Sequence, residues 1–256
     1  LIELNLSKNK LTTLPEWLGQ LTQLTDLNIS SNQLTTLPDS LGQLALIRSL
    51  DVSENKLKIL PDSLGQLTQL EALNISNNQL SALPDLLGNL IELEFLDLSS
   101  TEIRTPNWIK NLKKLTAYLS DNNKITEVPE ILSQIPQLTM LSLENNQISL
   151  LPEWMSTFTQ LTHLYLSNNQ IRSLPEWIGD LVTIKTLYVY SNELTQIPIS
   201  LNKLTNLFDF ELSYNPLNPA LQSAYNACKR GKYEPLFAYL RSLEQNAKPL
   251  YEAKLV

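Results

Sequence analysis

The stretch LTQLTDLNISSNQLTTLPDSLGQ, residues 21–43, carries the pattern that decides the fold. Its apolar side chains follow the order LxxLxL, and Asn32 and a Leu-Pro step at Leu37 and Pro38 come next. In LxxLxL the last two apolar residues alternate, so they point to one side of a short strand. The same frame returns after 23 residues, which indicates a chain built from stacked copies of one small unit.

An asparagine column marks these units. The side-chain amide of asparagine can both donate to and accept from backbone groups where the chain turns away from a strand. The Leu-Pro step suits the start of a short helical segment that returns along the other side. No unit can bury its leucines alone, so stacked units must share one core. Ten units are marked by Asn9, Asn32, Asn55, Asn78, Thr101, Asn123, Asn146, Asn169, Asn192 and Asn215.

This frame resembles the leucine-rich repeat family over residues 1–217. The resemblance implies an α/β solenoid, a right-handed horseshoe whose concave side is lined by a parallel β-sheet. Residues 218–247 are expected to form a helical C-terminal cap, because Asn218 and Pro219 suit a helix start and two helical patterns follow. Since Leu1 already falls on a frame leucine, we expect the natural chain to extend upstream.

One unit departs from the frame. Thr101 replaces the asparagine, and the step from Thr101 to Asn123 is one residue short. The next strand then places Ser120 inward and Leu119 outward, and a one-residue slip with a bulge would reverse that. The favoured interpretation is a tolerated deletion, and the alternative is a local break in curvature between two halves.

Composition narrows the functional classes. The 256 residues are 43% hydrophobic and 18% charged, as in folded soluble proteins, and no apolar run is long enough to span a bilayer. The net charge of −7 disfavours nucleic acid as a partner. Cys228 is the single cysteine, so no internal disulfide is possible and a cytoplasmic location is expected.

No catalytic, metal-binding or phosphate-binding motif occurs in the sequence, so we expect no enzyme activity, cofactor or metal in these residues. Asp26, Asp51 and Asp97 face the predicted concave side. Solvated surface is the favoured interpretation and a calcium site is the alternative, because clustered ligands from one loop are missing.

The concave positions change from polar and acidic in the early units to aromatic in the later ones. Exposed aromatic side chains often anchor protein partners, because they bury a large area at low entropic cost. The alternative is that these rings pack on one another and only stabilise the sheet. The candidate partner-binding residues are Phe95, Met140, His163, Tyr165, Tyr188, Tyr190 and Tyr214. By contrast, Trp17, Trp108, Trp154 and Trp177 follow the proline step and are expected to be packing residues.

The end of the chain resembles the junction of Roco proteins, in which a helical AYLRSL segment leads into EAKLV. That resemblance implies a regulatory domain for a downstream Ras-like GTPase (Roc) and COR pair, with intramolecular contact to both. Residues 248–256 would be a linker and the first GTPase strand, while GTP or GDP and Mg²⁺ would belong to that later domain. The alternative is a free-standing bacterial leucine-rich repeat effector or scaffold protein.

Overall fold

The computed structural model describes the backbone of residues 1–252 and the side chains of residues 1–245. The chain divides into two compact units. The first unit comprises Leu1–Ile125 and Pro129–Leu143, and the second comprises Thr126–Val128 and the chain from Glu144 onward.

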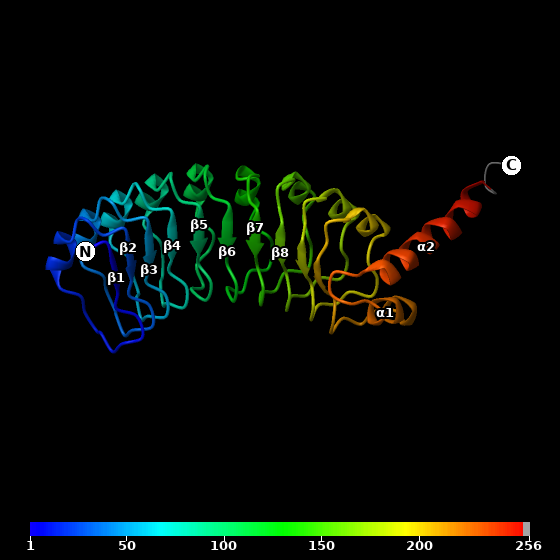
Figure 1. The fold of residues 1–256 in the computed structure, drawn as a ribbon, viewed down its shortest axis with the longest axis horizontal. Helices are drawn as coiled ribbons and strands as arrows, with labels where there is room; N and C mark the ends of the chain where they lie inside the picture. The colour runs from blue at the N-terminus through cyan, green and yellow to red at the C-terminus, as the bar shows by residue number, and fades with distance from the viewer. Residues whose placement is uncertain (253–256) are drawn as a thin grey trace. The chain divides into compact units, whose positions relative to one another are not determined.

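The first unit contains a parallel sheet of three-residue strands, each paired with the next in the chain (Figure 1). Equivalent repeat positions face one another, since Leu27 pairs with both Leu4 and Leu50. The predicted strands and their parallel pairing are confirmed here. The strands are β1 (Glu3–Asn5), β2 (Asp26–Asn28), β3 (Ser49–Asp51), β4 (Ala72–Asn74), β5 (Phe95–Asp97), β6 (Ala117–Leu119) and β7 (Met140–Ser142).

Each return segment of the first unit is a single 3-10 helix that starts directly after the proline of the repeat. Its third residue, such as Leu41, is buried, so the core lies between these helices and the strands. Gly42 allows close approach, because a Cβ there would lie 2.5 Å from the carbonyl oxygen of Ser63 in the next helix. The helices are η1 (Glu16–Gln20), η2 (Asp39–Gln43), η3 (Asp62–Gln66), η4 (Asp85–Asn89), η5 (Asn107–Asn111) and η6 (Glu130–Gln134).

The second unit repeats this plan and ends in two α-helices (Figure 1). Its strands pair in parallel, β8 with β9 and β9 with β10. Asn218 caps α1 as predicted, because its side chain accepts a hydrogen bond from the Leu221 amide. The elements are η7 (Glu153–Thr157), β8 (His163–Tyr165), η8 (Glu176–Asp180), β9 (Thr186–Tyr188), η9 (Ile199–Lys203), β10 (Asp209–Glu211), α1 (Pro219–Asn226) and α2 (Glu234–Glu252).

The asparagine column ties neighbouring repeats together. The buried Asn55 amide donates to the carbonyls of Val52 and Ser53 in its own repeat and to that of Ile29 in the preceding one, over 3.0–3.1 Å. Its Oδ1 accepts the amide of Leu34 at 3.0 Å. One side chain therefore satisfies four backbone groups that would otherwise be buried without partners, which is the role the sequence predicts.

The shortened repeat keeps the strand register. Tyr118 occupies a leucine position, is fully buried and pairs with Leu96 across the sheet. Its hydroxyl lies 2.8 Å from Thr105 Oγ1, in the loop that is one residue short. Ser120 is buried inward and Leu119 is half-exposed, so the pairing does not slip and the repeat tolerates the deletion.

The tryptophans do not all pack as predicted. Trp108 and Trp177 are buried, and Trp154 is half-buried. Trp17 is 57% exposed, so the prediction was wrong there. The reason is the stacking direction: Trp108 packs against Gly88 of the preceding helix η4, whereas the described chain has no 3-10 helix before η1.

The C-terminal helix continues past residue 247, where the sequence predicts the cap to end, because α2 runs to Glu252. The sequence places a linker and the start of a GTPase strand at residues 248–256. Residues 248–252 belong to α2, and residues 253–256 lie outside the described part of the chain. Within the described part of the chain, no helix combines the length and apolarity that a membrane span requires.

Candidate functional site

The seven candidate residues divide between the two units. Phe95 on β5 and Met140 on β7 belong to the first unit, and both are half-buried. The other five belong to the second unit. Five of the seven lie at strand positions that point away from the leucine core, whereas Tyr190 and Tyr214 lie after the ends of β9 and β10.

Three of the five residues in the second unit form one cluster. The rings of His163 and Tyr165 on β8 stack with their centroids 6.2 Å apart. Tyr165 meets Tyr188 of β9 edge to face at 5.2 Å, and these two residues are direct partners in the sheet register. We call His163, Tyr165 and Tyr188 the aromatic patch. Each side chain remains half-exposed, so the rings hold one another in place and still present surface to a partner.

The other two tyrosines lie outside this cluster. Tyr190 follows β9, and its hydroxyl accepts a hydrogen bond from the Asn168 amide at 3.3 Å. Tyr214 is 85% exposed and has a left-handed backbone with a φ of 56°. Among the described residues it makes no ring contact with the aromatic patch.

The aromatic patch is fixed to the C-terminal cap through a buried carboxylate. Asp209 on β10 is 8% exposed, and its Oδ2 accepts a hydrogen bond from the Tyr188 hydroxyl at 2.8 Å. Arg230 donates from Nη2 to the same oxygen at 2.6 Å. Burial, and then the hydrogen bond and the negative charge of Asp209, raise the pKa of Tyr188 to about 12, against a smaller opposing effect of Arg230.

Arg230 lies in a tight turn between α1 and α2. Lys229 and Lys232 pair across this turn through both of their backbone groups, and Gly231 supplies a positive φ of 70°. The turn rests on Phe208, because the Arg230 guanidinium lies 5.5 Å from the centre of that ring. We call residues 229–232 the basic turn.

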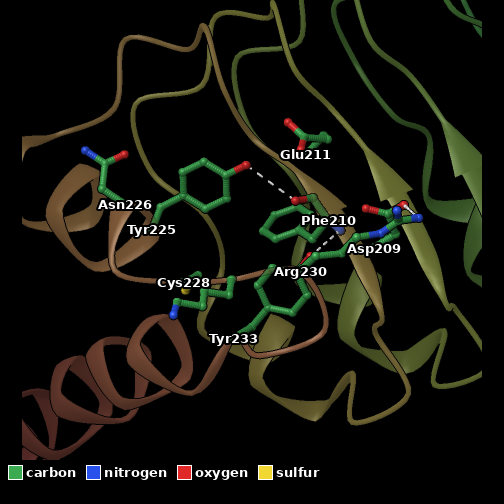
Figure 2. A pocket seen from close by; sticks show the side chains of 9 residues that line it. Asp209, Phe210, Glu211, Tyr225, Asn226, Cys228, Arg230 and Tyr233 are labelled. Carbon is green, nitrogen blue, oxygen red and sulfur yellow. Dashed lines mark hydrogen bonds and ion pairs between the residues drawn. The ribbon is translucent and has the colours of Figure 1, made fainter.

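A pocket of about 250 Å³ lies between β10 and the cap (Figure 2). Beside this pocket, the hydroxyls of two cap tyrosines accept hydrogen bonds from backbone amides in and just after β10. The Tyr233 hydroxyl accepts from the Phe210 amide at 2.8 Å, and the Tyr225 hydroxyl accepts from the Leu212 amide at 3.1 Å. Figure 2 shows Tyr225 and Tyr233 on either side of Phe210, whose ring each of them meets edge to face. The lining residues are Asp209, Phe210, Glu211, Tyr225, Asn226, Cys228, Lys229, Arg230 and Tyr233.

Sequence reasoning missed Phe208, Asp209 and Arg230 as site residues. One signal was available, since residues 1–217 carry 13 basic and 23 acidic side chains, whereas residues 218–256 carry 6 basic and 3 acidic. That reversal of charge pointed to the cap, but not to the contact of Arg230 with β10.

Among the described residues, no group of three or more His, Cys, Asp or Glu side chains could hold a metal ion. The Cys228 thiol donates to the carbonyl of Ala224, and burial raises its pKa, which disfavours the reactive thiolate.

The three aspartates considered for calcium are half-buried and bonded locally, not simply solvated. Asp51 and Asp97 accept backbone amides two residues ahead, at 3.0 and 2.9 Å. Asp26 accepts the Thr25 hydroxyl at 2.5 Å. Asp51 and Asp97 thus stabilise the turn after each strand.

Three family models match the chain: Leucine-rich repeat region at residues 2–119, Leucine rich repeat at 110–171, and Leucine Rich repeats (2 copies) at 159–203. No curated protein sequence matches it significantly.

Several solved structures are similar. A leucine-rich repeat protein of Leptospira interrogans is 32% identical over 88% of this chain and 64% of its own, with a TM-score of 0.72. The functional domain of InlJ from Listeria monocytogenes is 29% identical over 85% of this chain and 45% of its own, with a TM-score of 0.69. The ectodomain of the Arabidopsis receptor kinase HAESA, in complex with an extended IDA peptide hormone, is 30% identical over 83% of this chain and 38% of its own, with a TM-score of 0.69. The chain thus spans less than two thirds of each of these proteins.

Proposed function

Because residues 2–203 form a leucine-rich repeat domain, we propose that this chain binds a peptide segment of a protein partner on the aromatic patch of its second unit. The observation that carries the proposal is the arrangement of His163, Tyr165 and Tyr188, whose rings hold one another by contact while each stays half-exposed. Rings fixed in advance lose little entropy when a partner covers them, so they suit the centre of an interface.

The comparison with HAESA supports a peptide as the occupant, since that ectodomain is in complex with a peptide hormone. Tyr190 lies two residues after Tyr188 and extends the proposed contact past the end of β9. Phe95, Met140 and Tyr214 remain proposed contact residues that lie outside the aromatic patch.

A matched pair of substitutions tests this proposal. Random peptides displayed on phage would be selected on the whole chain, and enriched peptides would be synthesised for affinity measurements. Tyr188→Ser should weaken their binding by roughly 1–3 kcal/mol, the range of a moderate hot spot. Leu187→Ala at the buried neighbour should cost roughly 2–5 kcal/mol of folding stability. The proposal would be refuted if no peptide were enriched, or if Tyr188→Ser left the affinity for the enriched peptides unchanged.

We further propose that the domain is cytoplasmic and regulates a Roco-type GTPase domain that follows it. The support is the order of segments at the C-terminal junction, AYLRSL and then EAKLV. Guanine nucleotide and Mg²⁺ would belong to that later domain. Calorimetry should detect GDP binding by the natural protein and none by residues 1–256; binding by residues 1–256 alone would contradict the assignment.

The alternative is a free-standing bacterial repeat protein, for which the similarity to the Leptospira and Listeria proteins is the support. A natural protein that binds no guanine nucleotide would favour this alternative. The peptide-binding proposal does not depend on whether the domain is linked to a GTPase or is free-standing.

A further inference from the structure

Basic side chains gather around one exposed aromatic ring in the second unit. Phe208 is 59% exposed and carries the Arg230 guanidinium over its face. Lys229 and Lys232 flank Arg230 in the basic turn, and both are exposed. The exposed Lys185 directly precedes β9, as Phe208 directly precedes β10, and its carbonyl accepts the Phe208 amide at 2.8 Å.

Most of these positive charges have no ion-pair partner among the described residues. Within the part of the chain that the structure describes, Lys185, Lys229 and Lys232 form no ion pair. Arg230 is paired with Asp209 through one nitrogen, yet its side chain stays 69% exposed. Within residues 1–245, three of these four cations are therefore unpaired, which favours a partner of opposite charge even though Asp209 and Glu211 line the neighbouring pocket.

The basic turn and the aromatic patch form one continuous surface. Tyr188 of the patch and Arg230 of the turn both donate to Oδ2 of Asp209, at 2.8 and 2.6 Å. A peptide on this surface would therefore contact both the tyrosine rings and the Arg230 guanidinium, which Asp209 holds together by hydrogen bonds. The pocket beside β10, lined by Lys229 and Arg230 together with Asp209 and Glu211, lies at the end of this path.

We infer that this surface binds an acidic peptide segment, with an apolar or aromatic side chain on the patch and a carboxylate at the basic turn. The inference rests on the proposed function and adds the chemistry of the partner. Nucleic acid would also meet cations and rings, but it needs many phosphate contacts, and the net negative charge of the chain opposes them.

The test uses the peptides selected on the whole chain. They should be enriched in Asp and Glu, and their affinity should fall as salt rises. The double variant Lys229→Glu/Lys232→Glu should weaken binding about tenfold or more. Lys56→Glu/Lys58→Glu, which makes the same charge change at exposed sites of the first unit, should leave affinity unchanged. Thermal melting checks that both variants stay folded, and Lys229→Ala/Lys232→Ala should give a smaller loss of the same kind.

The outcomes separate the two proposals. Peptides without acidic residues, or affinity unaffected by either change at Lys229 and Lys232, would overturn this inference. The proposed function would then still stand if Tyr188→Ser weakened binding. If neither the lysine nor the tyrosine variants changed affinity, both would fail. Tighter binding of single-stranded oligo-dT than of the peptides, lost in the Lys229→Glu/Lys232→Glu variant, would also overturn the acidic-peptide inference.

Discussion

Tyr188 donates its phenolic hydrogen to the carboxylate of Asp209 over 2.8 Å, although the two residues lie 21 positions apart on neighbouring strands. The same oxygen accepts Arg230 from the turn before α2. An exposed face of the sheet is thereby joined to the cap through one buried acid.

This contact predicts a late tyrosine titration. Burial and Asp209 raise the pKa of Tyr188 to about 12, whereas an ordinary tyrosine titrates near 10. The folded state therefore favours the neutral phenol, and the stability linked to it is complete below pH 10 and is lost as pH rises toward about 12. Asp209→Asn removes the negative charge and should lower the pKa of Tyr188. Ultraviolet titration, with Tyr188→Phe to assign the signal, measures this, and identical titrations of wild type and Asp209→Asn would refute the contact.

The asparagine column predicts that removing a single asparagine side chain lowers the free energy of unfolding considerably. Asn78→Ala removes an amide that donates to the carbonyls of Val52, Ile75 and Ser76, and an oxygen that accepts the Leu57 amide. Leaving these buried groups unpaired should lower the free energy of unfolding by roughly 3 kcal/mol. Denaturant unfolding of Asn78→Ala beside Gln79→Ala, whose side chain is exposed, provides the comparison. Equal stability of the two variants would mean that the column is not structural.

The close contact between neighbouring 3-10 helices predicts that adding a methyl group at Gly42 destabilises the fold. In Gly42→Ala the new Cβ would lie 2.5 Å from the backbone oxygen of Ser63, which cannot rotate away. Overpacking of this kind should cost roughly 1–3 kcal/mol of stability. Ser156→Ala, at the same position of η7, already has a side chain and should change little. A Gly42→Ala protein that unfolds at the wild-type denaturant concentration would contradict the stacking.

The cap predicts that a single hydroxyl protects the edge of β10. Tyr233→Phe keeps the ring but leaves the buried Phe210 amide without its acceptor. The cost should be roughly 1–3 kcal/mol, and hydrogen exchange of the Phe210 amide should accelerate. Tyr239→Phe loses only a 3.5 Å contact with Asn218 and serves as the control. Unchanged exchange at Phe210 in Tyr233→Phe would show that the edge is protected by other means.

The sequence by itself determined the repeat unit, its strands, the inward leucines and the role of the asparagines. These features are local and recur with a period of 23 residues, so the alternation within one repeat also sets the register with the next. Even the short repeat followed this rule, because Tyr118 and Ser120 kept the inward positions of the frame.

Only the tertiary structure decided which candidates contact one another. The aromatic column was visible in the sequence, but the mutual contact of Tyr165 and Tyr188 depends on ring geometry across two strands. The bond of Arg230 to Asp209 was not predictable, since it depends on how the turn after α1 folds back onto β10. Such contacts join residues that no periodicity relates, and they are specified by packing in three dimensions.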